Sequence, residues 1–113
     1  MAPNERNNPE QKEGLAVAER PKTKQPKKYV VVFHNDDYTT MEFVVHVLMK
    51  FFYLDETAAT RVMLHVHQKG FGIAGTYSRD VAETKVSQVM AYAKEHGHPL
   101  KCTAEVEGFG GPE

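Results

Sequence analysis

A buried strand that runs directly into a capped helix limits the fold of this chain more strongly than its overall composition does. Residues 29–33 read Tyr-Val-Val-Val-Phe, and such a run of β-branched and aromatic side chains favours a strand buried on both faces. The turn-forming sequence His-Asn-Asp-Asp follows at residues 34–37. The sequence therefore predicts an acidic turn held between a core strand and the element that comes next.

That next element is predicted to be a helix. Thr39 and Glu42 have the spacing of a capping box, in which Thr39 caps the helix and Glu42 reaches back to it. Tyr38 and Phe43 occupy the positions of a hydrophobic staple. Apolar residues then recur at helical spacing and indicate one buried stripe, made of Met41, Val44, Val45, Leu48, Phe51 and Phe52.

Four further elements follow from capping residues, glycines and apolar periodicity. Two glycines in the predicted second strand indicate twist or a close approach of neighbouring backbone. The expected elements, in chain order, are a helix from Asp55 to Lys69 stopped by Gly70, a strand at 71–77, a helix opened by Ser78 or Asp80, and a strand at 100–106. We therefore predict an α+β fold in the order β-α-α-β-α-β, a small sandwich of a three-stranded antiparallel sheet and three helices.

The 113 residues suit one folded domain with less ordered ends. Residues 1–27 hold four of the six prolines and no aromatic residue, so we expect a disordered arm. Its apolar patch at residues 15–18 is either a short docking element or part of a featureless tail. We expect the core domain at residues 28–107 and a flexible tail at residues 108–113.

Charge and cysteine content narrow the classes of function. The net charge of −1 gives no general basis for binding nucleic acid, and we interpret the basic run at residues 22–28 as solvated linker. One cysteine, Cys102, allows neither an intrachain disulfide nor a cysteine-based metal site, which fits a reducing compartment. No segment has the apolar length of a membrane span or the features of a signal peptide, so we expect a soluble, cytoplasmic protein.

Two groups of residues are candidates for a binding site. The loop residues Asn35 and Asp36 carry amide and carboxylate acceptors, although both types are also common in turns, and we assign Asp37 to the turn. On the second helix, Met63, Val66 and His67 lie three and four positions apart and project together. An α-ammonium group offers three donors and needs such acceptors beside an apolar hole, which Met41, Val44, Met63 and Val66 can line.

Catalysis and metal binding find no support in the sequence. His65 and His67 lie two positions apart on a helix and point away from each other, so they cannot share one ion. There is no nucleophile elbow and no phosphate-binding glycine loop. We expect a protein that is not an enzyme and that holds no cofactor.

Four ordered blocks of the sequence resemble the ClpS family, the N-degron adaptors of the ClpA-ClpP protease. The blocks read NDDYTTMEFV from residue 35, ATRVMLHVH from residue 59, VAETKV from residue 81 and HPLKCT from residue 98. The resemblance implies an adaptor that binds a protein with an N-terminal Leu, Phe, Tyr or Trp and delivers it to the ClpA unfoldase for degradation by ClpP. It also implies a monomer with no nucleic acid or membrane partner.

The resemblance also implies roles for particular residues. Asn35, Asp36 and His67 match the residues that hold the α-amino group. Asp80 and Lys85 match residues that contact the N-terminal domain of the unfoldase. The side-chain pocket is implied to consist of Thr39, Met41, Val44, Met63, Val66 and Leu100.

Two positions depart from the family pattern. Thr40 stands where the family has proline in the first helical turn, and His34 stands where it has an aliphatic residue, which could alter the pocket edge. The alternative to an adaptor is an interaction domain like the C-terminal domain of the ribosomal stalk protein. That family shares the small α+β architecture but needs no amine-binding loop.

Overall fold

The order of the elements is the one predicted. The computed structural model describes residues 26–111, so most of the arm expected at residues 1–27 lies outside the described residues. The elements are β1 (Tyr29–His34), α1 (Met41–Phe52), α2 (Glu56–Lys69), β2 (Phe71–Tyr77), α3 (Arg79–Glu95) and β3 (Lys101–Val106). The predicted α+β class and the antiparallel pairing of all three strands are confirmed.

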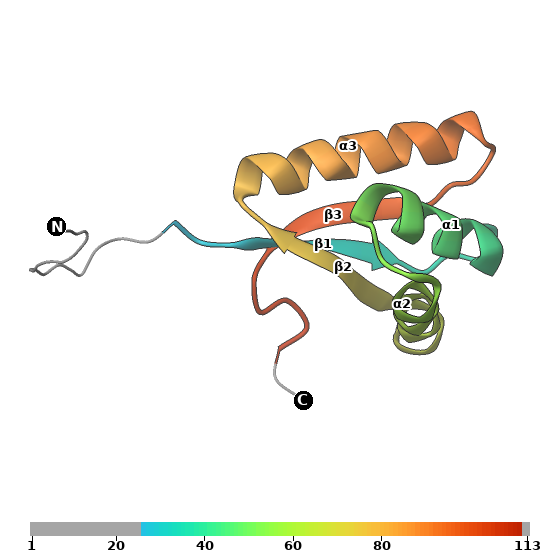
Figure 1. Ribbon diagram of the computed structural model, residues 1–113, viewed down its shortest axis with the longest axis horizontal. Coiled ribbons are helices and arrows are strands. Elements are labelled where there is room, and N and C mark those ends of the chain that lie inside the picture. The colour runs from blue at the N-terminus through green and yellow to red at the C-terminus, as the bar shows by residue number, and fades with distance from the viewer. Residues whose placement is uncertain (1–25, 112–113) are drawn as a thin grey trace, which may run out of the picture.

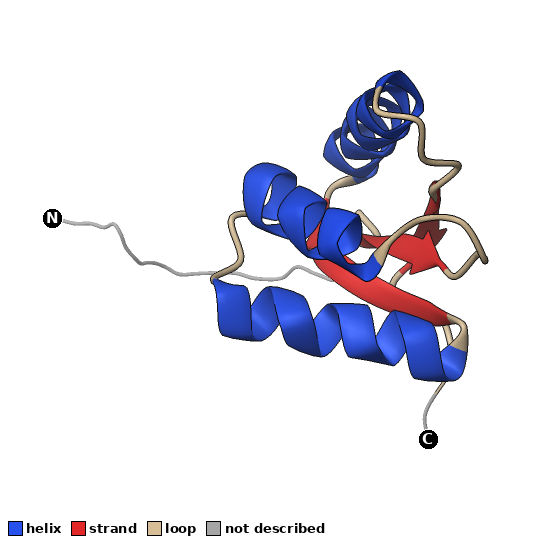
Figure 2. Ribbon diagram, turned by 90° about the vertical axis from the view of Figure 1, so that its right-hand side faces the viewer, coloured by secondary structure: helices blue, strands red, loops and turns tan. Residues whose placement is uncertain are grey.

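The apolar run at residues 29–33 lies in β1, the central strand of the sheet. The strand order is β2-β1-β3, with β1 antiparallel to both neighbours. Val31, Val32 and Phe33 are each 0% exposed, as expected for a strand buried on both faces. α1 and α3 cover one face of the sheet and α2 lies beside β2 (Figures 1 and 2). No helix within residues 26–111 is long and apolar enough to cross a membrane.

Glycine in β2 brings α2 close to the sheet. A Cβ atom added at Gly72 would lie 2.6 Å from Cγ2 of Val66 and 3.1 Å from the carbonyl oxygen of Val62. Any larger residue at position 72 would therefore push α2 outward. The close approach predicted from the glycines is present, and it fixes the distance of α2 from the loop after β1.

The helix cap predicted for α1 is wrong by one residue. Thr40, in extended conformation, is the N-cap, and its hydroxyl accepts a hydrogen bond from the amide of Phe43 at 3.0 Å. The hydroxyl of Thr39 instead donates to the carboxylate of Asp36 at 2.7 Å. The staple predicted from Tyr38 and Phe43 also fails, since Tyr38 is 79% exposed.

The caps of the other two helices agree with the sequence predictions. Asp55 accepts from the amide of Ala58 at 2.8 Å, and Gly70 ends α2 with a left-handed φ of 92°. Ser78, rather than Asp80, caps α3. These caps set the ends of α2 and α3, and those ends carry the residues of functional interest.

Candidate functional site

A cavity of about 260 Å³ opens where the loop between β1 and α1 faces α2. It gathers eight of the nine residues that the family resemblance assigned to substrate binding, together with Asp37. The lining residues are Asn35, Asp36, Asp37 and Thr39 from the loop, Met41 and Val44 from α1, and Met63, Val66 and His67 from α2. Segments about thirty residues apart in the sequence thus form one site.

Three residues lie differently from what the sequence analysis expects of the lining. Leu100, the ninth expected residue, is 5% exposed and belongs to the hydrophobic core, as Val44 and Val66 do, but it is not among the residues that line the cavity. His34 also lies outside the lining. Its Nε2 hydrogen-bonds to Thr103 Oγ1 on β3 at 2.8 Å, which directs the ring across the sheet. Asp37, assigned above to the turn, is an exposed member of the lining.

The carboxylate of Asp36 organises the loop. Its Oδ1 accepts from the amides of Tyr38 and Thr39, each at 2.7 Å, and its Oδ2 accepts from the hydroxyl of Thr39 at 2.7 Å. Burial raises the pKa of Asp36, but these hydrogen bonds outweigh it and hold the pKa below the ordinary value of 3.8. Asp36 is therefore a fixed negative charge at neutral pH.

The loop is also tied to the end of α2. The amide of Asn35 donates to the carbonyl oxygen of Gly70 at 3.0 Å, directly beyond the C-terminus of the helix. His67 lies in the last turn of the same helix and is exposed. The C-terminal end of a helix carries partial negative charge, which favours a cation nearby. This end of α2 therefore offsets the unfavourable positive end of α1.

The other end of the cavity is apolar. Val44 and Val66 are 6% and 4% exposed and provide a rigid floor. Met41, 44% exposed, and Met63, half-buried, stand higher and carry flexible thioether side chains. The cavity can therefore hold a cationic amine at one end and an apolar side chain of variable shape at the other.

His98 lies outside the cavity lining but influences Asp36, a role that the sequence does not reveal. Its ring stacks on Phe43 with centroids 3.9 Å apart, and its charge lowers the pKa of Asp36. Its Nδ1 is buried without a hydrogen-bond partner among residues 26–111. The sequence signal for His98 is its place at the start of the family block that begins at residue 98.

The two residues expected to contact a partner lie on α3, away from the cavity. Asp80 is exposed in the first turn, and both residues line a shallow depression of about 310 Å³ with Val81, Thr84 and Gln88. The ammonium of Lys85 donates to the carbonyl oxygen of Phe51 at 2.6 Å. It also lies 5.2–5.7 Å from the ring centroids of Phe52, Tyr53 and Tyr77. Lys85 thus has a structural role at the end of α1 that the sequence did not reveal.

Within residues 26–111, no group of three or more His, Cys, Asp or Glu side chains is placed to hold a metal ion.

A small α+β domain whose cavity joins fixed acceptors to an apolar floor is a ligand-binding domain. The family model described as ATP-dependent Clp protease adaptor protein ClpS matches residues 24–103. The chain belongs to the ClpS family of Clp protease adaptors.

Relatives and a solved structure agree with this assignment. The ATP-dependent Clp protease adapter protein ClpS of Rhodospirillum centenum is 56% identical over 92 residues, 81% of this chain and 85% of the relative. ClpS 1 of Agrobacterium fabrum is 59% identical over 86 residues, 76% of this chain and 74% of the relative. The structure of Agrobacterium tumefaciens ClpS2 bound to L-phenylalaninamide has 42% identity and a TM-score of 0.71, covering 74% of this chain and all of that one.

Proposed function

We propose that this adaptor captures proteins with an N-terminal Leu, Phe, Tyr or Trp and delivers them to the ClpA unfoldase for degradation by ClpP. The observation that carries the proposal is the cavity, which places Asn35, Asp36 and His67 beside the apolar floor of Val44 and Val66. An N-terminal residue carries one group for each end of the cavity on a single carbon atom: an ammonium for the polar end and a side chain for the apolar floor.

The ligand of the Agrobacterium tumefaciens ClpS2 structure supports this reading. L-phenylalaninamide has a free amine and an aromatic side chain, and its carboxamide stands in for the first peptide bond of a protein. A ligand of this kind matches the cavity of the present chain at both ends. The similarity of the two chains, at 42% identity, supports a shared class of ligand.

In this proposal the polar residues bind the ammonium in two ways, by charge and by direct hydrogen bonds. Loop hydrogen bonds take up about three of the four acceptor positions of the Asp36 carboxylate, so in our proposal Asp36 acts chiefly through its charge. The side chains of Asn35 and His67 provide the direct acceptors, the latter as a neutral imidazole. Two such bonds to a charged group contribute roughly 1.5–3 kcal/mol each, and burial of a Leu or Phe side chain roughly the same. With about 1–3 kcal/mol added for the charge of Asp36, and roughly 4 kcal/mol subtracted for the entropy lost on association, the upper end of this range reaches an affinity on the order of micromolar.

Delivery is assigned to other surfaces. In our proposal the monomeric adaptor contacts the N-terminal domain of ClpA through the depression that holds Asp80 and Lys85, while residues 1–27 enter the pore of the unfoldase. The rim of the depression is available because Asp80, Val81 and Thr84 are exposed. The bond from Lys85 to Phe51 fixes the shape of this surface. An interaction domain of the ribosomal-stalk kind would share the fold but would have no use for the amine-binding cavity.

The experiment is degradation of a fluorescent protein with an N-terminal Leu by purified ClpA and ClpP. Adding the full-length adaptor is expected to accelerate loss of fluorescence, and the same reporter with N-terminal Ala is expected to show no acceleration. Removal of residues 1–27 is expected to abolish delivery and leave binding of the Leu peptide intact. Equal acceleration of the Leu and Ala reporters would contradict the proposal.

A further inference from the structure

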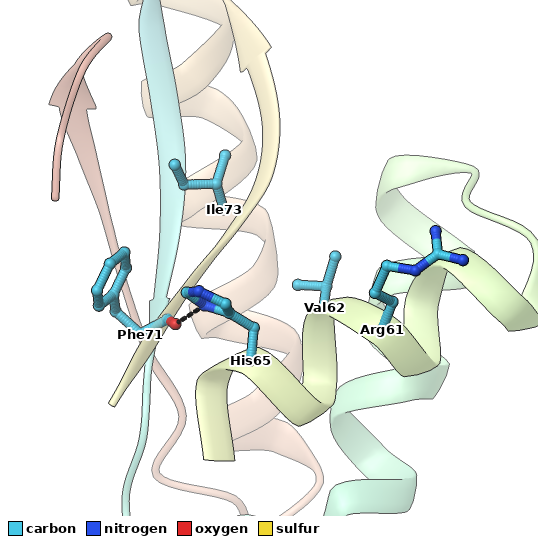
Figure 3. Close-up of a pocket in the computed structure, with 5 residues that line it drawn as sticks. All are labelled: Arg61, Val62, His65, Phe71 and Ile73. Carbon is cyan, nitrogen blue, oxygen red and sulfur yellow. Dashed lines mark hydrogen bonds between the residues drawn. The ribbon is translucent and has the colours of Figure 1, made fainter. Parts of the chain in front are cut away.

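A second cavity lies between α2 and β2 and shares no residue with the amine-binding cavity. It has a volume of about 290 Å³ and is lined by Arg61, Val62, His65, Phe71 and Ile73. Figure 3 shows Val62 and His65 projecting from α2 toward β2, with Arg61 at the outer end of the site. Neither the family relationship nor the proposed delivery mechanism assigns a role to this site.

The walls of the second cavity are firmly held. Nδ1 of His65 lies 2.7 Å from the carbonyl oxygen of Phe71, and since a carbonyl only accepts, Nδ1 carries the proton. The rings of these two residues meet edge to face at 5.3 Å. On its other side, Phe71 packs against Phe109 from the segment after β3, with centroids 5.4 Å apart. The apolar wall is thus preformed, and Ile73 remains 37% exposed beside it.

The charge at the rim of the second cavity is positive. Its lining includes Arg61 and no acidic residue. Within residues 26–111, Arg79 and Glu83 form the one ion pair shorter than 4.0 Å, so Arg61 has no carboxylate partner there. An occupant that fits this cavity is a short apolar segment with a carboxylate beside it.

We propose that residues 13–19 of this same chain occupy the second cavity. They read Glu-Gly-Leu-Ala-Val-Ala-Glu and contain the longest apolar run ahead of Pro26. In an extended chain Leu15 and Val17 point to the same side, so both can enter the cavity between Val62 and Ile73. Glu13 and Glu19, at the two ends of the run, supply the carboxylate for Arg61.

The connection is long enough for this arrangement. The segment enters the fold at Tyr29, and Ile73 lies opposite Val32, three residues further along β1 and so about 10 Å away. The twelve residue steps from Val17 to Tyr29 can span up to roughly 40 Å. A tether of this kind raises the effective concentration of the segment to the order of millimolar, so weak contacts suffice for occupancy. Docking concerns the free chain, before residues 1–27 enter the pore of the unfoldase, so its test does not depend on the proposed delivery function.

The test uses methyl resonances of the full-length chain. Changing Leu15 and Val17 together to Ser removes the two inserted side chains and is expected to shift the methyl signals of Val62 and Ile73. The matched control changes the alternate positions, Ala16 and Ala18, to Ser and is expected to leave those signals in place. Signals that do not move, or that move equally in both variants, overturn the proposal.

A charge reversal provides the second arm of the test. Arg61→Glu is expected to shift the methyl signals of Val62 and Ile73 as the Leu15 and Val17 changes do, and Glu13→Lys with Glu19→Lys in the same chain is expected to restore them. If the charge reversal does not restore the methyl signals, the assignment of Glu13 and Glu19 as partners of Arg61 is overturned. Signals that depend on protein concentration, with a doubled mass in sedimentation, identify a second copy as the occupant and overturn the proposal.

Discussion

Asp36→Asn separates the hydrogen bonds by which this carboxylate shapes the loop from the charge that we propose attracts the ammonium group. The amide oxygen of Asn can still accept from the backbone amides of Tyr38 and Thr39, so the loop keeps most of its geometry. The negative charge is lost, and the hydroxyl of Thr39 loses its ionised acceptor at 2.7 Å. The substitution therefore acts mainly on the interaction with a cation in the cavity.

The size of this effect follows from Coulomb's law. Two unit charges about 5 Å apart interact by roughly 0.8 kcal/mol in water and roughly 3.3 kcal/mol at an effective dielectric constant of about 20. Asp36 is partly buried at the mouth of the cavity, between these limits. We expect Asp36→Asn to weaken binding of a Leu-ended peptide by about 1–3 kcal/mol, or about 5-fold to 150-fold.

The assay is calorimetric titration with two peptides that differ only at the amine. One begins with Leu, and the other begins with its des-amino analogue, 4-methylpentanoyl. Asp36→Asn is expected to weaken only the first, and Asp37→Asn, which removes a charge one residue further on, is expected to have a smaller effect. An equal loss for both peptides would refute the reasoning, because Asp36 would then act only by shaping the loop.

The same substitution predicts a pH dependence of stability. The hydrogen bonds hold the folded-state pKa of Asp36 below its ordinary value of 3.8, so its contribution is complete above that pH and is lost as pH falls through the folded-state pKa. The difference in unfolding free energy between the original chain and Asp36→Asn, about 1 kcal/mol at neutral pH, should shrink in urea titrations as the pH is lowered below 3.8. A difference that persists unchanged there would contradict this origin.

Three further predictions concern the scaffold. Lys85→Met removes the hydrogen bond to the carbonyl oxygen of Phe51 and should lower the unfolding free energy by about 1–3 kcal/mol in urea titrations. An unchanged unfolding free energy would contradict a structural role for Lys85. Thr40→Ala should cost about 1 kcal/mol by the same measurement, since it removes the cap on the amide of Phe43, and an unchanged stability would contradict that role. Burial raises the pKa of Cys102 to about 12, so this thiol should resist alkylation at pH 8 until urea unfolds the chain, and rapid labelling of the folded protein would show otherwise.

Local patterns predicted most of the fold because each element carries its own signal. Residues 29–33 are apolar throughout, and the resulting strand is the central one. The exact start of α1 was not predictable, since Thr39 and Thr40 are both suitable caps. The choice depends on Asp36, whose carboxylate takes the hydroxyl of Thr39 and leaves Thr40 to cap the helix.

The sequence predicted the candidate site less completely than it predicted the fold. The family blocks named eight cavity residues, but they also named Leu100, which precedes β3 and is buried in the core through tertiary packing. The aromatic surroundings of Lys85 come from α1 and β2, which only the folded chain brings together. The stacking of His98 on Phe43 is likewise a tertiary contact between residues 55 positions apart.

Binding of an N-terminal amine in the cavity of Asn35, Asp36 and His67 is tested most directly by one pair of titrations. The peptides are a Leu-ended peptide and the same peptide acetylated at its N-terminus, measured by calorimetry with the full-length chain. The free peptide is expected to bind with a Kd on the order of micromolar, and acetylation is expected to weaken binding at least about 100-fold, because it removes the charge and most of the donors. Equal affinity for the two peptides would contradict recognition of the amine by this cavity.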